Sequence, residues 1–437
     1  MAVSQKISLA PLLAVNFVGT LGFSIVTPFL VILVTGWGGN GVVYGVMAAT
    51  YSFFQLFGAP ILGRMSDRIG RRRVLIYSQL GTLISWAIFL LAFALPSGAL
   101  VNIDSTLLGS FTITLPLIVL FVARAADGLT GGNVSVSNAY LADITNKADR
   151  SKNYGQMAVS SNLGFIFGPA LAGLLGATVL GEILPVMLAF AISAAALALI
   201  QFGLRDIPAK IVTEQLEPPS ACDVYGQEHK PAYQVHSKKP GGIYTIFRLP
   251  NMAALMAINF LIMLGFSFFY SAFPVHAVQA LGWSVFEMGT YFAVVSLLMV
   301  IVQGPILGWA AKRISDRALM AIGGAILTFG FFGLLSESIA PIYFSAAAIA
   351  LGNGLMWPTF MSTLSKSADS ETQGAVQGFA GSAGAIASIL GLVGGGIIYT
   401  QQGAWAFMMA GIAIAVSAII ALTVRTTAGD DEETIAA

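Results

Sequence analysis

Between Ile7 and Gly63 the chain contains no Asp, Glu, Lys or Arg, and this uncharged run is the feature that most constrains the fold. A helix needs about 20 apolar residues to cross the hydrocarbon core of a bilayer. The run has room for two such spans, and Trp37-Gly38-Gly39-Asn40-Gly41 supplies the turn between them. The N-terminal segment is too long, and lacks a small-residue cleavage site, for a cleaved signal peptide.

The composition of the whole chain agrees with a membrane protein. Hydrophobic residues make up 57% and charged residues 9%, with a mean hydropathy of +0.83. Soluble domains carry about 25% charged residues, so we exclude a soluble enzyme, a disordered scaffold and a nucleic-acid-binding protein. One cysteine and three histidines exclude a disulfide framework and leave little for a metal, so we expect neither a metal nor a cofactor.

Charge-poor segments recur along the chain and predict an all-α membrane protein with twelve transmembrane helices in two pseudo-symmetric six-helix halves. We place the helices near 9–34, 42–62, 74–95, 113–141, 155–177, 183–204, 251–275, 287–310, 318–336, 341–364, 376–399 and 404–424. The predicted domains are the halves 1–204 and 251–425, a proline-rich linker at 205–250 and an acidic tail at 426–437. Cys222, His229 and His236 lie in this linker at spacings that match no metal template.

Basic residues predict the orientation. With both termini on one side, that side collects every Lys and Arg except Arg124, whereas the other side receives only acidic residues (Asp104, Glu182, Glu287 and Glu337). We therefore predict a multi-pass protein of a plasma membrane, a bacterial inner membrane in particular, with both termini cytoplasmic. The halves also share a repeat, because Pro60-Ile61-Leu62-Gly63 recurs as Pro305-Ile306-Leu307-Gly308. Internal repeats are typical of secondary transporters, which bind their substrate at the repeat interface.

The most specific motif in the chain is the string Gly63-Arg64-Met65-Ser66-Asp67-Arg68-Ile69-Gly70-Arg71-Arg72-Arg73. Gly63 and Gly70 allow a tight reversal between two helices, and Asp67 lies among five arginines, where we expect it to be ionised and paired. The alternative is a basic anchor with an incidental Asp, which accounts for the arginines but not for the glycines.

The fourth predicted helix carries charges inside its span. Arg124, Gly128, Gly131, Ser135 and Asn138 are spaced four, three, four and three apart and share one face, and Asp127 lies three residues after Arg124. A charge at the bilayer centre costs about 2.5–3.5 kcal/mol on insertion scales, so such residues face an interior cavity and mark an ion or proton path. The alternative is a neutralised Arg–Asp pair that only fixes helix contacts.

In the fifth predicted helix Gly164, Gly168, Ala172 and Gly176 recur every four residues, and Pro169 adds a bend. Close helix packing and a hinge both explain this pattern. Other polar or aromatic residues are candidates to line a substrate cavity, although each alone also fits a helix–helix hydrogen bond. These candidates are Asn16 and Gln55 in the first half and Asn259, Tyr270, Gln303, Asn353 and Trp357 in the second.

These motifs resemble the major facilitator superfamily, whose signature G-x-x-x-D-R-x-G-R-R the loop at 63–73 matches. Three further regions are similar to the twelve-helix drug:proton antiporters, especially tetracycline-efflux proteins. They are Arg124–Gly128 together with Ala139–Thr145, then Gly164–Gly173, and finally Gly374–Gly378. The chain departs from that pattern in three places. Lys312 replaces the acid in the second loop, Ala172 replaces a glycine, and the first helix lacks the acid of tetracycline-efflux proteins.

The resemblance implies proton-driven efflux of a small, partly hydrophobic organic molecule. From the residues we predict that Asp127, the only acidic residue that we place inside a span, couples the proton together with Arg124, and we expect a monomer. The resemblance also implies a cytoplasmic gate made by Gly63, Asp67, Arg68, Gly70, Arg71 and Arg72 with Asp143, and a hinge at Gly164, Gly168, Pro169 and Gly173. The alternatives are metabolite uptake or efflux without drug export and, with least support, a receptor or scaffold. We expect no enzymatic activity, because the spans contain no catalytic cluster.

Overall fold

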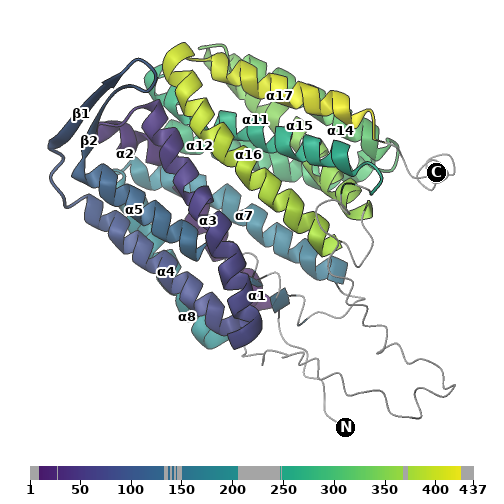
Figure 1. Cartoon of the computed structure of the whole chain (residues 1–437), viewed down its shortest axis with the longest axis horizontal. Helices are drawn as coiled ribbons and strands as arrows, with labels where there is room; N and C mark the ends of the chain where they lie inside the picture. Colours follow the sequence, from purple (N-terminus) through teal and green to yellow (C-terminus); the bar gives the residue numbers. More distant parts are fainter. Residues whose placement is uncertain are drawn as a thin grey trace, which may run out of the picture.

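The computed structural model describes residues 9–26, 28–131, 136–137, 140–141, 144, 150–204, 247, 249–367 and 373–424. The described helices of the first half are α1 (Ala10–Ser24), α2 (Leu30–Gly36), α3 (Gly41–Ile69), α4 (Arg71–Ala92), α5 (Leu115–Thr130), α7 (Arg150–Gly176) and α8 (Ile183–Gly203). Those of the second half are α11 (Met252–Gln279), α12 (Val285–Ile301), α13 (Leu307–Ala310), α14 (Asp316–Gly333), α15 (Ile339–Lys366), α16 (Gln373–Gln402) and α17 (Trp405–Ala421). They form one bundle, with early helices on one side and late helices on the other (Figure 1).

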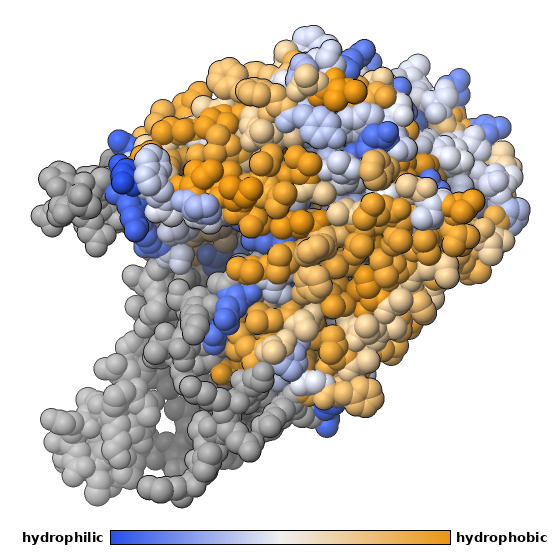
Figure 2. Space-filling view, turned by 180° about the vertical axis from the view of Figure 1, so that it is seen from behind, coloured by the Kyte–Doolittle hydropathy of each residue, from blue (hydrophilic) through white to orange (hydrophobic). Residues whose placement is uncertain are grey.

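The all-α membrane fold is confirmed. Nine described helices are long and apolar enough to cross a membrane, and Ala10–Gly22 and Trp405–Ala421 are shorter apolar helices. The sides of the bundle expose large hydrophobic residues such as Phe329 and Phe344, and Figure 2 shows hydrophobic residues over most of one face. Exposed apolar surface on this scale suits contact with lipid.

The first predicted helix is interrupted in the structure. α1 ends at Ser24 and α2 begins at Leu30, so the predicted continuous span 9–34 is wrong in this detail. Pro28 lies between the two helices, and proline supplies no backbone N–H and disfavours a helical conformation in the residue before it.

The reversal predicted at Gly63–Arg73 is much tighter than expected. α3 continues through Pro60 and Gly63 to Ile69, and Gly70 alone separates it from α4. Gly70 has φ 101° and ψ 146°, a conformation that only glycine adopts easily. Gly63 is therefore a helical residue, and the prediction that it makes the turn is wrong. The physical reason is that one glycine of positive φ suffices to reverse the chain.

The fourth predicted helix is also interrupted, since Gly131 is non-helical and the described residues 136–137, 140–141 and 144 are helical again. α5 ends at Thr130, and Gly131 is its C-cap with non-helical ψ, so a single helix over 113–141 is wrong. Arg124 and Gly128 lie on α5, whereas Gly131 has left it. The predicted continuation of this face through Ser135 and Asn138 lies outside the described residues.

The connection before α5 is a β-hairpin that the sequence reasoning did not predict. Strands β1 (Ala99–Ser105) and β2 (Gly109–Thr114) pair antiparallel at one end of the bundle (Figure 1). The hairpin tip reaches the second half, where Gln401 Nε2 donates to the carbonyl oxygens of Thr106 (3.3 Å) and Leu107 (2.9 Å). The hairpin therefore bridges the two halves at this end, which we call the hairpin end.

Glycines bring the two halves into close contact toward the hairpin end. A side chain at Gly45 of α3 would lie 2.4 Å from the carbonyl oxygen of Leu392 in α16, and one at Gly396 would lie 2.6 Å from that of Gly41. On the other side of the bundle, a side chain at Gly289 of α12 would meet Gly173 of α7 at 2.7 Å. Only glycine allows these backbones to approach so closely.

At the opposite end, which we call the basic end because most of the described Lys and Arg residues lie there, the described helices α3 and α16 of the two halves are apart. Side chains added at Gly63 of α3, or at Gly378 and Gly381 of α16, would meet no described atom within 4 Å. In Figure 1 α3 and α16 diverge toward this end. Among the described residues, the two halves are therefore in contact at the hairpin end, and α3 and α16 are separated at the basic end.

Candidate functional site

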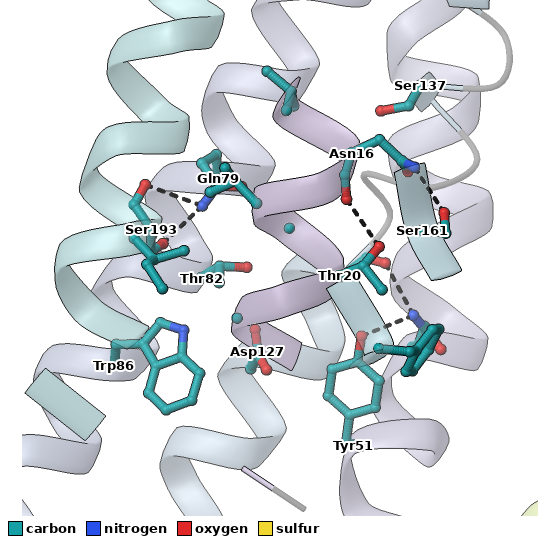
Figure 3. Close-up of a pocket in the computed structure, with 18 residues that line it drawn as sticks. Asn16, Thr20, Tyr51, Gln79, Thr82, Trp86, Asp127, Ser137, Ser161 and Ser193 are labelled. Atoms are coloured by element: carbon teal, nitrogen blue, oxygen red, sulfur yellow. Dashed lines mark hydrogen bonds between the residues drawn. The ribbon is translucent and has the colours of Figure 1, made fainter. Parts of the chain in front are cut away.

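A cavity of about 340 Å³ lies inside the first half. Its walls come from α1, α3, α4, α5, α7 and α8, together with Ser137, and we call it the first cavity (Figure 3). Asn16, Gln55, Asp127 and Gly131, four of the sequence candidates, line it. The structure therefore brings together polar residues from helices that are far apart in the sequence.

Arg124 and Asp127 form the predicted ion pair, of which Asp127 lines this cavity and Arg124 does not. Arg124 Nη1 lies 3.6 Å from Asp127 Oδ2, and the two side chains are only 9% and 14% exposed. The guanidinium also lies over the ring of Tyr51, 4.8 Å from its centroid, while its Nε has no hydrogen-bond partner. The ion pair is thus long and the guanidinium incompletely hydrogen-bonded, while the carboxylate lines the cavity beside Thr82.

Two other sequence candidates in the first cavity also hold helices together. Asn16 Nδ2 donates to Ser161 Oγ (2.7 Å) and to the carbonyl oxygen of Met157 (3.0 Å), both on α7. Gln55 Nε2 donates to the carbonyl oxygen of Gly131 (3.0 Å) and to the hydroxyl of Tyr51 (3.0 Å). Both amides therefore make the helix–helix hydrogen bonds of the alternative hypothesis while they face the cavity.

The sequence reasoning missed the wall that α4 and α8 contribute. Gln79, Thr82 and Trp86 of α4 face the cavity, and Gln79 Nε2 donates to Ser193 Oγ of α8 at 2.7 Å. The spacing of three and four residues between Gln79, Thr82 and Trp86 places them on one helix face, and this signal was present in the sequence. Figure 3 shows Trp86 and Thr82 beside Asp127.

A second cavity of about 420 Å³ lies mainly in the second half. Four sequence candidates line it, namely Tyr270, Gln303, Asn353 and Trp357. Phe165 of α7 lines both cavities, so the two adjoin at its ring. Asn259 lines neither, because its buried Nδ2 donates to the carbonyl oxygen of Ala380 (2.7 Å) and joins α11 to α16.

The glycines of α7 contact both halves. Side chains at Gly164 and Gly168 would collide with Thr20 and Ser24 of α1, whereas Gly173 lies against Gly289 of α12. The carbonyl oxygen of Pro169 also lies against Gly289. The motif is therefore a packing surface between α1 and α12, which agrees with the packing hypothesis and places the predicted hinge at the contact between the halves.

The residues of the predicted gate lie at the basic end. Arg71 Nη1 donates to Ser66 Oγ (2.6 Å), and the guanidinium of Arg72 donates to the carbonyl oxygens of Ile200 (3.3 Å) and Gln201 at the end of α8. Arg68 is exposed. The side chain of Asp67 and the whole of Asp143 lie outside the described part of the chain, so their predicted contacts stay predictions.

Metal ligation has no support in the described ranges, where no group of three His, Cys, Asp or Glu side chains is placed to hold an ion. The substrate and proton roles of the cavity residues stay predictions at this point.

Membrane-crossing helices in two groups, with adjoining cavities and a buried ion pair, define a polytopic membrane protein with internal cavities. The chain belongs to the Major Facilitator Superfamily, whose family model matches residues 12–392 and again residues 255–436. The predicted family is thereby confirmed.

Three relatives illustrate this membership. Tetracycline resistance protein, class C, of Escherichia coli is 27% identical over 87% of this chain and 85% of the relative. Multidrug resistance protein 2 of Bacillus subtilis is 24% identical over 94% of each chain. The solved structure of the human organic anion transporter MFSD10 (TETRAN) superposes with a TM-score of 0.64 at 19% identity, covering 96% of this chain and 100% of that one. Homologues of this kind are transporters and not enzymes, which supports the prediction of no enzymatic activity at the level of the family.

Proposed function

We propose that this protein is a proton-coupled exporter of a small, partly hydrophobic organic molecule. The proposal depends above all on Asp127, which is the one acidic side chain in the described walls of either cavity. A carboxylate inside a bilayer bundle is energetically costly, and such residues commonly belong to a proton relay. The names of the tetracycline and multidrug resistance relatives support export of a drug-like molecule.

The geometry of the ion pair supports a competition between proton and substrate. At 3.6 Å the Arg124–Asp127 pair is held by charge more than by a short hydrogen bond. Protonation of Asp127 would remove that attraction and leave the buried guanidinium without a counter-ion. Arg124 lines neither cavity in this structure, so its side chain would have to turn toward the first cavity to attract a polar or anionic group of the substrate. A proton and a substrate are then expected to stabilise different states of the site.

The open basic end supplies the access that export requires. Basic residues mark the cytoplasmic side of membrane proteins, so we assign the basic end to the cytoplasm and the hairpin end to the outside. We infer that in this state the cavities are reached from the cytoplasm, between the separated ends of α3 and α16. Export follows if the halves rock, so that the hairpin end opens while the basic end closes.

Transport into inverted membrane vesicles tests the proposal. A respiratory or imposed proton gradient, acid inside, is monitored with a pH-sensitive dye while compounds are added one at a time, with tetracycline included because of the named relatives. We expect at least one compound to dissipate part of the gradient and to accumulate only in vesicles that contain the protein. Accumulation that survives a proton ionophore, or that depends on sodium, would reject proton coupling.

The orientation has its own test. In a Cys222→Ser background, we expect an impermeant thiol reagent to label Asp104→Cys in intact cells and to leave Lys312→Cys unlabelled until the cells are opened. Both positions are exposed, Asp104 in β1 at the hairpin end and Lys312 at the basic end. The reverse labelling pattern would reject a cytoplasmic basic end.

The gate prediction concerns Asp67 in the loop motif. We expect Asp67→Asn to cut transport while leaving equilibrium substrate binding nearly unchanged, because the residue lies in sequence outside the spans and would stabilise the closed basic end through the positive N-terminus of α16 and nearby arginines. Transport rate and binding affinity are measured on the same preparation. Asp316→Asn is a control at the same end of the second half, since Asp316 is the first residue of α14 and pairs with Lys366 at 3.0 Å. Loss of binding with normal turnover would contradict the gate.

A further inference from the structure

The second cavity has walls of a different chemistry from the first. Aromatic rings dominate it, namely Phe165, Phe266, Phe269, Tyr270, Phe292 and Trp357. Tyr270 and Phe292 lie nearly parallel, with an interplanar angle of 11° and centroids 6.3 Å apart. Tyr270 remains 42% exposed although it belongs to the core helix α11. Aromatic walls of this kind favour a flat ring, which can stack face-on or pack edge-to-face against them.

The cavity contains no charged side chain among its described lining residues. An ionised group that entered would lose its hydration without finding a counter-ion, and this desolvation is costly. The carboxylate of Asp127 lines the neighbouring first cavity instead, which shares Phe165 with the second, and Arg124 is its ion-pair partner. The part of a ligand that fits the second cavity is therefore uncharged.

Amide groups in the same walls have weak partners. Asn353 Nδ2 donates only to the sulfur of Met299, at 3.6 Å, and Asn162 Nδ2 reaches Gln303 Oε1 at 3.4 Å across the two halves. Sulfur is a weak acceptor and 3.4 Å is long for an amide hydrogen bond. These amides are suited to exchange their present partners for a carbonyl or hydroxyl group on a ligand.

The backbone of the second half is adapted to present Gln303. The residues Val302–Ile306 form a π-helical turn between α12 and α13, with Pro305 inside it. A side chain at Gly354 of α15 would lie 2.6 Å from Val302, so only glycine lets α15 pack against this turn. π-Helical turns inside transmembrane helices often coincide with functional sites, and this one turns Gln303 toward the cavity.

We propose that the second cavity is the subsite for an uncharged planar ring of the substrate, and that the adjoining polar or ionisable end passes Phe165 to the Arg124–Asp127 pair. This inference rests on the proposed export function and adds the substrate class. In this arrangement the second half binds the flat apolar part of the substrate, and the first half binds its polar or ionisable end. A cavity of about 420 Å³ is within the size range of sites for drug-sized ligands.

One tryptophan in each cavity makes the proposal measurable. Trp357 lines the second cavity and Trp86 the first. Two purified proteins are prepared that keep only Trp357 or only Trp86, with the other tryptophans replaced by phenylalanine. The probes are a brominated phenanthridine, which is planar and is neutral at pH 7, and its N-methylated cation. Bromine quenches tryptophan emission on contact. We expect the neutral probe to quench Trp357 saturably, with an affinity at least about tenfold above that of the cation.

Substitutions at the cavity wall sharpen this test. Tyr270→Ala should weaken binding of the neutral probe roughly tenfold, while Tyr270→Phe, which keeps the ring, should bind as the parent does. Asn353→Asp keeps the shape of the side chain and adds a charge, so at a pH where the new carboxylate is ionised it should reverse the preference in favour of the cation. This variant does not depend on removing packing and so guards against misfolding.

Binding and transport fail separately in this design. The quenching is measured at equilibrium on purified protein without a gradient, so a loss of proton-driven export leaves the binding result standing. Quenching of Trp86 alone, or equal affinity for both probes in the parent protein, would overturn the assignment of the ring to the second cavity even if export is demonstrated. Unchanged preference in Asn353→Asp would overturn the argument from missing charge.

Discussion

Asp127→Asn should abolish accumulation of substrate driven by a pH gradient in inverted vesicles, to the level of vesicles without the protein, while exchange of labelled substrate at equal pH continues. The substitution keeps the size of the side chain and resembles its protonated form, so the site can no longer release a proton. Exchange needs the cavity and the rocking of the two halves but no net change in protonation. Accumulation and exchange are measured on the same vesicles.

Asp104→Asn is the matched control for this prediction. Asp104 lies in β1 at the hairpin end, where its Oδ1 accepts from Ser110 Oγ at 2.7 Å in an exposed hydrogen bond. We expect this variant to behave as the parent protein in both assays. If Asp127→Asn still concentrates substrate at the parental rate, the proton site lies elsewhere and Asp127 serves only as the structural partner of Arg124.

Gly45→Val should reduce transport at least about tenfold by preventing closure of the hairpin end. Overpacking a close contact costs about 1–3 kcal/mol, and about 1.4 kcal/mol lowers the population of the closed state tenfold. The first atom of the new side chain would lie 2.4 Å from the carbonyl oxygen of Leu392, which cannot rotate away. Thr400→Cys reports the change, since Thr400 Oγ1 is buried in this structure and contacts the same seam. We expect its labelling by an impermeant thiol reagent to increase.

Gly36→Val separates this effect from a general loss of stability. Gly36 ends α2 near the same end of the bundle, and a side chain there would meet no atom within 4 Å. We expect parental transport and unchanged labelling of Thr400→Cys. A monodisperse Gly45→Val protein with parental transport and no added labelling would contradict the close seam between α3 and α16.

The all-α membrane class of the fold could be predicted because the bilayer imposes it locally. A run of about 20 apolar residues must form a helix in hydrocarbon, whatever its neighbours. The absence of charge between Ile7 and Gly63 therefore predicts two spans. The same argument singled out Arg124 and Asp127, because charges inside a span are rare and their spacing of three makes a pair on one helix. The structure places them 3.6 Å apart.

Helix ends were predicted less well, because single residues decide them. A glycine can continue a helix or reverse the chain, and the sequence treats Gly63 and Gly70 alike. Only the conformation shows that Gly63 lies inside α3 and that Gly70, at φ 101°, makes the turn. The β-hairpin was missed for a related reason, since it depends on partners such as Gln401 that lie far away in the chain.

The sequence by itself determined which residues are chemically unusual, namely the buried Arg124 and Asp127 and the polar residues scattered through apolar helices. Tertiary structure alone decided how they are shared between two cavities, that Asn259 joins helices instead, and that Gln79, Thr82 and Trp86 complete the wall around Asp127. Which face of an apolar helix meets a cavity and which meets a neighbour depends on packing between distant segments, where glycine contacts as close as that of Gly45 with Leu392 set the geometry. Local sequence patterns do not predict these pairings between distant segments.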